Sequence, residues 1–234
     1  MSNTLEIKAV TKKFGDIIAV NDVSLNVKAG TVMALIGPNG SGKTTLLNCV
    51  VGLLRPETGR VLIKGLDIQE KPVVAKRLFS YISDNPAIYP YLSGLEFMRL
   101  TAKLHGLTED QTEKKITELK SLFPIEEVLA ARTESYSRGN LEKTAFLSAL
   151  ISDPTLLIID EPIVGLDPAS IRLFGNTLRR FVKAGGAVLL STHTLEFARE
   201  YADTIGIIHG GKLLKELSVT AKINIEYIYQ RFTT

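Results

Sequence analysis

Apolar and polar residues alternate with a period of two over the first 30 residues of the chain. Such alternation sends successive side chains to opposite faces of a strand, so one face can be buried while the other meets water. The apolar positions of this pattern are Leu5, Ile7, Ala9, Val23, Leu25 and Val27. The pattern predicts half-buried strands that open the fold as an antiparallel layer.

Three later segments are short and continuously apolar, with polar or glycine-rich residues at their ends. They are Val32–Ile36, Leu156–Ile159 and Val188–Leu190. A strand that helices cover on both faces needs no alternation, and this is typical of parallel strands. We therefore predict an α/β core around a mixed, mainly parallel sheet.

The stretch between the first and second of these apolar runs is rich in helix formers. Within about residues 86–150, the segments Gly94–Leu122 and Glu126–Ala131 carry apolar residues at helical intervals among Lys, Glu and Thr. We interpret residues 86–150 as an α-helical subdomain inserted into the core. Residues 1–234 then form a single domain.

The last part of the sequence predicts a hairpin and one further helix. Ile205–His209 and Lys212–Leu217 flank the pair Gly210-Gly211, which is a turn signal between two strands. Beyond them, a tail helix over about residues 218–234 would place four apolar residues on one face. These residues, spaced i, i+3, i+4 and i+7, are Ile225, Ile228, Tyr229 and Phe232.

The composition is that of an ordinary globular protein. The 234 residues are 45% hydrophobic and 23% charged, which excludes disordered and collagen-like chains. The single cysteine, Cys49, cannot form an internal disulfide, and we expect it to be a small core residue rather than a redox switch.

Charge and hydropathy exclude two further classes. The net charge of +3 is spread along the chain, so we expect no nucleic-acid partner. The apolar runs fall far short of the roughly 20 residues that a spanning helix needs, and the first residues show no secretory signal. We expect a cytoplasmic protein that does not enter the bilayer by itself.

Residues Gly37–Thr44 match the phosphate-binding pattern G-x-x-x-x-G-K-[ST]. The pattern directly follows the apolar run Val32–Ile36 and leads into Lys43–Leu54, a predicted helix. Backbone N–H groups of such a loop can surround phosphate oxygens at a helix N-terminus, where the helix dipole favours an anion. Lys43 would add a cation for the β- and γ-phosphates, and the Thr44 hydroxyl would bind Mg²⁺. The alternative is a glycine-rich turn that only joins a strand to a helix.

Two carboxylates follow the apolar strand Leu156–Ile159. Asp160 and Glu161 would lie at the carboxyl edge of the sheet, where α/β proteins bind ligands. Asp160 fits the carboxylate that holds Mg²⁺, and Glu161 fits the base that activates an attacking water. An acidic pair after a strand can also be a simple turn, so the pair indicates chemistry only together with the phosphate loop.

Four further segments narrow the class of nucleotide-binding protein. The stretch from Tyr136 to Pro162 resembles the signature-to-Walker-B region of ATP-binding-cassette (ABC) ATPases. The other three resemble their D-loop, switch-histidine segment and Q-loop, and are Gly165-Leu166-Asp167, Ser191-Thr192-His193 and Ile82-Ser83-Asp84-Asn85-Pro86. The likeness runs from Leu5 to beyond Leu217, with every motif in family order. It implies a P-loop NTPase core with a mixed, mainly parallel sheet, an N-terminal antiparallel β layer and an inserted α-helical subdomain.

The resemblance implies a chemical role for several residues. Lys43, Glu161 and His193 would be catalytic, with His193 in contact with the γ-phosphate. The ligands of Mg²⁺ would be Thr44, Asp160 and Asp84. A lone histidine can also be structural, and this alternative stays open for His193.

The resemblance also implies a set of contacts with ATP. Phe14 would stack on the adenine, because an aromatic ring offers a flat platform for a base; the alternative is that Phe14 packs in the core. Ser137, as a helix N-cap, and Gly139 would present N–H groups to the γ-phosphate bound to a second copy. The expected contacts are Phe14, Gly37, Pro38, Asn39, Gly40, Ser41, Gly42, Lys43, Thr44, Thr45, Ser137, Gly139 and Asp167.

The resemblance further implies partners. Each ATP would lie between the phosphate loop of one cassette and the signature helix of a second, which is another copy of the chain or a paralogous ATPase subunit. Closure of this head-to-tail dimer would drive separate membrane-spanning permease subunits, which hold the chain at the inner face of the membrane. The segment Asp84–Gly94 resembles the exporter-like group, so we expect export.

Two other functions fit the phosphate loop. One is an ABC-type ATPase that acts on ribosomes or DNA without transport, but that class typically has two fused cassettes or long coiled coils, and this chain has no sustained heptads. The other is a small-molecule kinase, which would leave the signature segment and His193 unexplained.

The chain departs from the family pattern at three places. Asp84 stands where the family usually has Gln, and its carboxylate adds negative charge beside the phosphates. The signature is Tyr136-Ser-Arg-Gly-Asn140 rather than Leu-Ser-Gly-Gly-Gln, and Arg138 adds a positive charge that could favour phosphate. Val164 replaces a small polar residue before Gly165. None of these changes removes the lysine, the magnesium carboxylate, the base or the histidine, so we expect an active ATPase.

Overall fold

Two sheets form the framework of the protein in the computed structural model, which describes residues 3–220 and 224–233. The first sheet is antiparallel, with the strand order β2(Ile17–Lys28), β1(Asn3–Phe14), β4(Thr58–Ile63), β5(Leu66–Asp67). The second has the order β10(Lys212–Ser218), β9(Thr204–His209), β3(Val32–Ile36), β8(Ala187–Thr192), β7(Leu156–Asp160), β6(Phe79–Ile82). Its strands are parallel except β10, which pairs antiparallel with β9. The mixed, mainly parallel sheet with an antiparallel layer is the fold class that the sequence predicts.

The antiparallel layer follows the predicted alternation with one correction. On β2, Val23, Leu25 and Val27 are buried while the residues between them are exposed or partly exposed. On β1 a bulge interrupts the pairing after Ile7, and Ala9 has a positive φ of 51°. Ala9 is therefore exposed, and Val10 takes the buried position that the sequence pattern assigned to Ala9.

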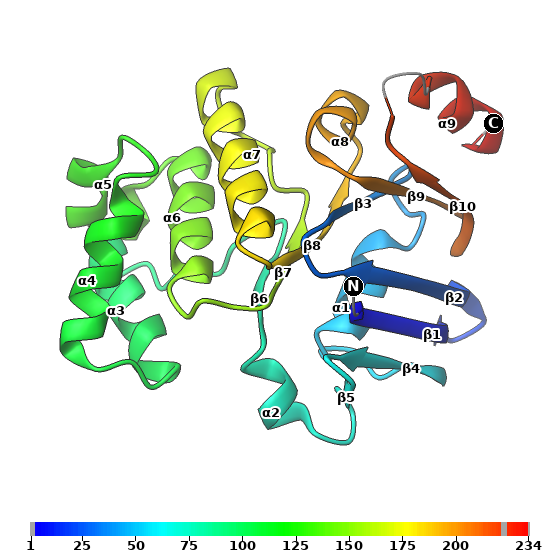
Figure 1. The fold of residues 1–234 in the computed structure, drawn as a ribbon, viewed down its shortest axis with the longest axis horizontal. Helices are drawn as coiled ribbons and strands as arrows, with labels where there is room; N and C mark the ends of the chain where they lie inside the picture. The colour runs from blue at the N-terminus through cyan, green and yellow to red at the C-terminus, as the bar shows by residue number, and fades with distance from the viewer. Residues whose placement is uncertain (1–2, 221–223, 234) are drawn as a thin grey trace.

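Helices connect and cover the strands (Figure 1). Their bounds are α1(Lys43–Val50), α2(Pro72–Lys76), α3(Gly94–Leu104), α4(Glu109–Lys120), α5(Glu126–Ala130), α6(Arg138–Leu150), α7(Pro168–Lys183), α8(Leu195–Tyr201) and α9(Ile225–Thr233), with a 3₁₀ turn at Thr133–Ser135. Among the residues with described positions, no helix is long and apolar enough to cross a membrane.

The parallel sheet separates two hydrophobic cores, because alternate side chains of a strand point to opposite faces. On β3, Val32, Ala34 and Ile36 belong to the core formed with α6, α7 and α8. Met33 and Leu35 belong to the core formed with α1 and the antiparallel sheet. Burial on both faces explains why this strand is continuously apolar in the sequence.

Four helices, α3 to α6, lie within the segment 86–150 that we interpret as inserted. Figure 1 shows α3, α4 and α5 at the opposite end of the molecule from β1 and β2. Capping boxes start two of these helices: Ser93 and Glu96 at α3, and Thr108 and Gln111 at α4. Local sequence signals therefore define the starts of helices that lie far from the phosphate loop.

The bounds of two helices, α1 and α9, differ from the bounds that the sequence predicts. Helix α1 ends at Val50, short of Leu54, because Gly52 adopts a left-handed conformation with φ of 72°. In the tail, the predicted start of the helix near residue 218 is wrong, because Ser218 ends β10 and α9 covers Ile225–Thr233. The apolar residues of α9 pack against the core. Residues 221–223 and 234 of the predicted tail helix lie outside the described residues.

A row of aromatic rings ties the helical segment to the core helices. Ring centroids of Phe146 on α6 and Phe174 on α7 are 4.0 Å apart. Phe123 lies 6.1 Å from Phe146 on one side, and Phe197 lies 6.4 Å from Phe174 on the other. The two central rings are buried, so their packing stabilises the junction between α6 and α7.

We predict that Phe146→Ala lowers the free energy of unfolding by about 3–5 kcal/mol, because it removes the ring that contacts two others and leaves a cavity. Urea denaturation of the purified chain measures this loss. Leu53→Ala, a truncation of an exposed side chain, is the control and should change the value by about 0.5 kcal/mol or less. If Phe146→Ala lowers the free energy of unfolding by less than about 1 kcal/mol, the packed rings do not stabilise the junction between α6 and α7.

Candidate functional site

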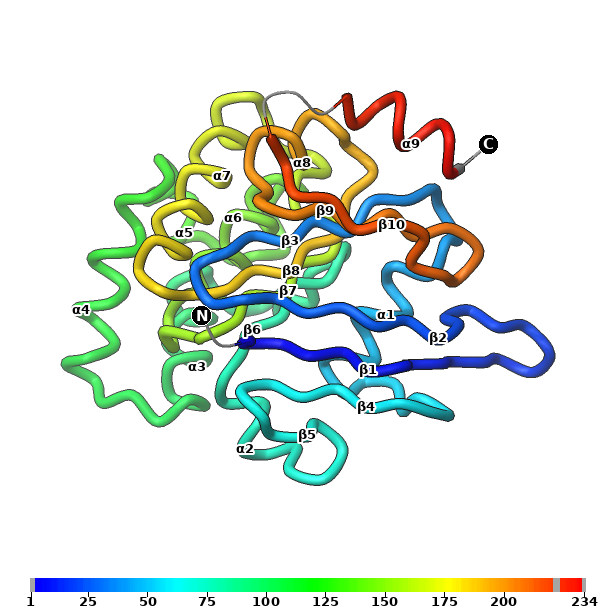
Figure 2. Tube along the Cα trace, turned by 45° about the vertical axis from the view of Figure 1, so that its right-hand side comes forward, coloured from blue at the N-terminus to red at the C-terminus, as the bar shows by residue number. Residues whose placement is uncertain are grey.

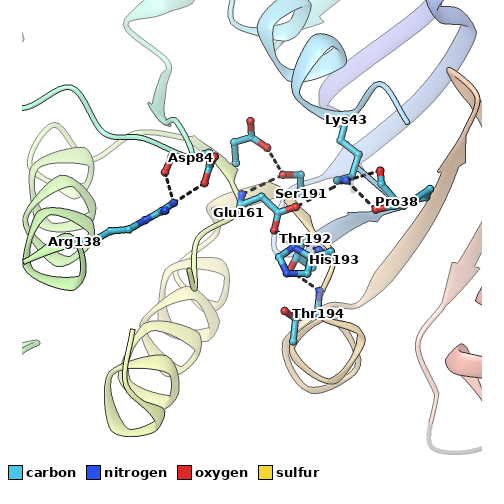
Figure 3. Close-up of polar contacts among 11 residues, drawn as sticks. Pro38, Lys43, Asp84, Arg138, Glu161, Ser191, Thr192, His193 and Thr194 are labelled. Atoms are coloured by element: carbon cyan, nitrogen blue, oxygen red, sulfur yellow. Dashed lines mark hydrogen bonds and ion pairs between the residues drawn. The ribbon is translucent and has the colours of Figure 1, made fainter. Parts of the chain in front are cut away.

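Three neighbouring parallel strands end at one edge of the sheet. Their register pairs Ile36 of β3 with Thr192 of β8, and Asp160 of β7 with Ser191 of β8. The phosphate loop, the acidic pair and His193 follow these strand ends, so the fold brings the three motifs together (Figure 3). This is the edge at which open α/β sheets bind ligands.

The phosphate loop wraps around the start of helix α1. Gly42 caps the helix in a left-handed conformation with φ of 102°, and a Cβ there would lie 2.3 Å from the carbonyl oxygen of Ala19. Only glycine fits this position. A cavity of about 230 Å³ lies against the loop, and its lining residues are Ala19, Asn39, Gly40, Ser41, Gly42, Lys43, Thr44, Thr45, Asp84 and Glu161.

Lys43 turns its ammonium group back onto its own loop. The Nζ atom donates hydrogen bonds to the carbonyl oxygens of Gly37, at 2.8 Å, and Pro38, at 3.2 Å. Burial lowers the pKa of Lys43, while the charges of Glu161 and Asp160 oppose this shift. A phosphate would offer this buried cation stronger acceptors than neutral carbonyl oxygens.

One buried oxygen of Asp160 makes no hydrogen bond within the described part of the chain. Its Oδ1 accepts a hydrogen bond from the Ser191 hydroxyl, whereas the buried Oδ2 has no partner among the described residues, and neither has the buried Ser41 hydroxyl of the loop. A buried unpaired carboxylate oxygen is costly unless it meets a cation or a donor. These oxygens, together with Thr44, fit a hard divalent cation such as Mg²⁺.

Ser191, which the sequence indicates only as part of the switch-histidine segment, has a positioning contact that the motif does not reveal. Its hydroxyl donates to Asp160 and accepts from the Glu161 N–H at 3.1 Å. Glu161 has a φ of 51°, an uncommon conformation for a residue with a side chain. One hydroxyl therefore contacts both the carboxylate of Asp160 and the backbone of Glu161, and this contact depends on the pairing of β7 with β8.

The Glu161 carboxylate lies between a lysine and a histidine (Figure 3). Its Oε2 is 2.8 Å from His193 Nδ1 and accepts from the His193 N–H at 3.3 Å. Its Oε1 is 3.9 Å from Lys43 Nζ. A carboxylate held in one orientation in this way can act as a general base.

Asp84 lines the same cavity but also forms an ion pair. Arg138 donates to Asp84 Oδ1 at 2.8 Å and to the Asp84 carbonyl oxygen at 3.1 Å. The charge of Arg138, which the sequence suggested for phosphate, therefore lies on a carboxylate of its own chain. Asp84 as a ligand of Mg²⁺ stays a prediction.

Glu142 is a buried carboxylate that the sequence analysis did not single out. Its side chain is 2% exposed, and its Oε1, which makes no hydrogen bond in the described structure, lies 4.0 Å from Arg138 Nε. Burial raises the pKa of Glu142 to about 8, against the smaller opposing effect of Arg138. A Glu on a polar-looking helix gives no sequence signal of such burial.

The signature segment and the D-loop pack against each other, away from this cavity. Ser137 caps α6 and accepts from the Asn140 N–H at 3.3 Å, and a Cβ on Gly139 would lie 2.7 Å from the Gly165 carbonyl oxygen. Asp167 caps α7, and hydrogen bonds from Ser170 lower its pKa. None of Ser137, Gly139 and Asp167 is among the described residues that line the loop cavity.

Phe14 and Cys49 have opposite surroundings. Phe14 lies at the end of β1, is 50% exposed and has the Lys12 ammonium 5.4 Å from its ring centroid. The alternative that Phe14 packs in the core is therefore wrong. Figure 2 shows the β1–β2 hairpin, in blue, extending beyond β3 and β8.

Cys49 is buried as expected, and burial raises the pKa of its thiol to about 11.

Comparison with known families gives a consistent result. Residues 20–164 match the model of the ABC transporter family. The chain is 32% identical to the ABC-type transporter ATP-binding protein EcsA of Bacillus subtilis, over 89% of this chain and 85% of EcsA. It is 33% identical to the Nod factor export ATP-binding protein I of Cupriavidus pinatubonensis, over 91% of this chain and 65% of that protein.

Another relative is much longer than the chain. The probable multidrug ABC transporter ATP-binding protein YbhF of Escherichia coli is 32% identical over 90% of this chain, which covers 36% of YbhF. The chain thus spans about a third of this relative.

Solved structures share the whole fold. An ATP-binding subunit of an ABC transporter superposes with a TM-score of 0.88 at 32% identity, covering 98% of this chain and 93% of that one. The dimeric bacterial ABC transporter cassette MJ0796 superposes with a TM-score of 0.85 at 25% identity, covering 93% and 99%.

The buried Glu142 predicts a pH-dependent stability. Its pKa is about 8 in the fold against an ordinary 4.5, so its contribution to stability is fully present below pH 4.5 and is lost as the pH rises toward 8. Glu142→Gln keeps the shape without the charge. We expect it to unfold like the wild type at pH 4.5 and to be more stable at pH 8 and above, by on the order of 1 kcal/mol or more.

Thermal or urea unfolding across this pH range measures the difference. Glu127→Gln, at an exposed carboxylate on α5, is the matched control and should show no such trend. A wild type and Glu142→Gln pair with equal stability at every pH would contradict the burial of an ionisable Glu142.

Proposed function

Since the chain belongs to the ABC transporter family, we propose that it binds ATP with Mg²⁺, hydrolyses it in a head-to-tail dimer and thereby drives separate membrane subunits. The observation that carries the proposal is the position of Glu161, with Oε2 2.8 Å from His193 Nδ1 and Oε1 3.9 Å from Lys43 Nζ. A base, a cation and a histidine from three different strand ends converge beside a glycine-rich loop. A turn that only joined a strand to a helix would need none of them.

The phosphate loop and Lys43 bind the phosphates of ATP in this proposal. The loop presents N–H groups at the start of α1, and Lys43 exchanges the carbonyl oxygens of Gly37 and Pro38 for phosphate oxygens. Thr44, Asp160 and, in this proposal, Asp84 hold Mg²⁺, which when bound neutralises charge that develops on the phosphates. The unpaired Oδ2 of Asp160 supports the assignment.

Glu161 accepts the proton of the attacking water, and His193 keeps the carboxylate in place. Both the backbone N–H and the ring of His193 contact Glu161 Oε2, so rotation of the carboxylate away from the loop would break two contacts. Lys43 lies on the other side of the carboxylate, with its Nζ 3.9 Å from Oε1. The positive φ of Glu161 turns its side chain from the end of β7 toward the loop.

A second copy, or a paralogous subunit, completes the site. Ser137 and Gly139 lie at the exposed start of helix α6, where N–H groups favour an anion, and they lie outside the loop cavity of their own chain. In the proposed dimer they contact the ATP of the other cassette, as does the segment around Asp167. The dimeric cassette with the same fold supports this arrangement. The half-exposed Phe14 ring is free to stack on adenine.

A permease is the proposed partner at the helical segment, beside the strand β6. A cleft of about 360 Å³ lies between β6, α3 and α6, lined among others by Phe79, Ile82, Ile88, Phe97 and Ala145. We assign it to a cytoplasmic segment of a membrane subunit, which would hold the chain at the inner face of the membrane. The name of the Nod factor export relative supports export as the direction.

We predict that Lys43→Ala lowers magnesium-dependent phosphate release from ATP by about 10²-fold or more, because the phosphates lose their buried cation. Steady-state phosphate release by the purified chain measures the rate. Lys183→Ala, at an exposed lysine on α7, should release phosphate like the wild type. Equal, magnesium-independent rates for wild type and Lys43→Ala would exclude the proposed function.

We predict that Glu161→Gln forms a dimer in saturating ATP, because the variant keeps the shape of the side chain but cannot accept the proton of the water. Size-exclusion chromatography with ATP in the running buffer measures the shift from monomer to dimer. The double variant Lys43→Ala/Glu161→Gln should stay monomeric, because its loop lacks the phosphate-binding cation. A Glu161→Gln chain that elutes only as a monomer in saturating ATP would count against the sandwich dimer.

A further inference from the structure

The Arg138 guanidinium contacts both the side chain and the backbone of Asp84. One guanidinium nitrogen donates to Asp84 Oδ1 at 2.8 Å and to the Asp84 carbonyl oxygen at 3.1 Å (Figure 3). Arg138 is the first residue of α6, and Asp84 follows the end of β6. The contact therefore connects the signature helix of the chain to the segment that borders its own phosphate loop.

The same Asp84 also lines the loop cavity, together with Thr44 and Glu161. Its carboxylate is thus shared by two places that attract cations: the Arg138 guanidinium, which is present, and the proposed position of Mg²⁺. A carboxylate already paired with a guanidinium is a weaker ligand for a second cation, because part of its charge is neutralised and Oδ1 is occupied.

The strength of the ion pair suits exchange rather than a fixed structural role. The side chains of Arg138 and Asp84 are 49% and 54% exposed, and an exposed ion pair contributes little to stability. A divalent cation held by phosphates and Thr44 can compete with a contact this weak. The pair can therefore break when nucleotide binds without unfolding either segment.

Arg138 would keep a partner after releasing Asp84. Its Nε lies 4.0 Å from the Oε1 of the buried Glu142, which makes no hydrogen bond within the described residues. A guanidinium has five N–H donors, so Arg138 can turn toward Glu142 as it leaves Asp84. Release then leaves the Arg138 guanidinium beside an oxygen acceptor of the Glu142 carboxyl.

We propose that Asp84 exchanges Arg138 for the divalent cation of bound nucleotide, so that Arg138 is a positioning residue that sets how much Mg²⁺ the site requires. The inference rests on the proposed function, because the cation arrives with ATP. It explains why Asp84 and Arg138 occur together: each compensates the charge of the other in the nucleotide-free chain. The exchange would also couple nucleotide binding in the phosphate loop to the position of the Arg138 side chain at the start of α6.

A double-mutant cycle in equilibrium binding tests the exchange. Four chains carry Glu161→Gln to prevent hydrolysis: the parent, Arg138→Gln, Asp84→Asn and the double variant. A fluorescent ATP analogue at fixed concentration is titrated with Mg²⁺, and the Mg²⁺ concentration at half-maximal binding is measured. Arg99→Gln, which breaks the exposed pair of Arg99 with Glu113 on α3 and α4, controls for the loss of one positive charge at the surface.

We expect Arg138→Gln to lower the required Mg²⁺ concentration about two- to fivefold, the equivalent of a surface ion pair. Asp84→Asn should raise it, and adding Arg138→Gln to Asp84→Asn should change nothing further. Arg99→Gln should match the parent.

Two results would overturn the inference. One is an unchanged Mg²⁺ requirement in Arg138→Gln. The other is an equal shift in the presence and absence of Asp84, which would mean that Arg138 acts on the cation through its field alone. Both leave the proposed function intact if the parent binds the analogue. A parent that binds no nucleotide at any Mg²⁺ concentration would overturn the proposed function and the inference together. Unfolding curves of the variants confirm that each is folded.

Discussion

Parallel, in-register pairing of β3, β8 and β7 is the constraint on which the site depends. The pairs Ile36 with Thr192 and Asp160 with Ser191 fix the three strand ends at the same level. A slip of one residue along β7 would send Asp160 to the opposite face. Burial of these strands in two cores makes such a slip costly, because it would expose the wrong set of apolar side chains. The hydrophobic cores thus hold the catalytic geometry.

The polar groups at this edge form a connected chain of contacts. Ser191 joins Asp160 to the backbone of Glu161, and Glu161 joins His193 to Lys43. Each of these ionisable groups has a defined neighbour, and the Asp160 oxygen that makes no hydrogen bond within the described residues is available to a cation. In low dielectric such a network is strong when complete and costly when a member is missing. Nucleotide and Mg²⁺ would complete it.

Local signals predicted the parts of the fold and site that depend on nearby residues. The phosphate-loop pattern located Lys43 and Thr44, and the apolar strand before Asp160 located the acidic pair. The structure and the family comparisons confirm the predicted fold class. Contacts between distant residues could not be predicted in this way. Arg138 pairs with a residue 54 positions away, the bulge that exposes Ala9 depends on pairing with β2, and burial of Glu142 depends on how α6 packs.

The most direct test of the account is a crystal structure of the Glu161→Gln chain with ATP and Mg²⁺. We expect the ATP phosphates in the Gly37–Thr44 loop, with Lys43 Nζ on phosphate oxygens rather than on the carbonyl oxygens of Gly37 and Pro38. We expect Mg²⁺ to contact Thr44 and to reach Oδ2 of Asp160 directly or through water. Nucleotide bound elsewhere, or Lys43 still on the loop carbonyls beside bound ATP, would contradict the claim that this edge of the sheet is the ATP site.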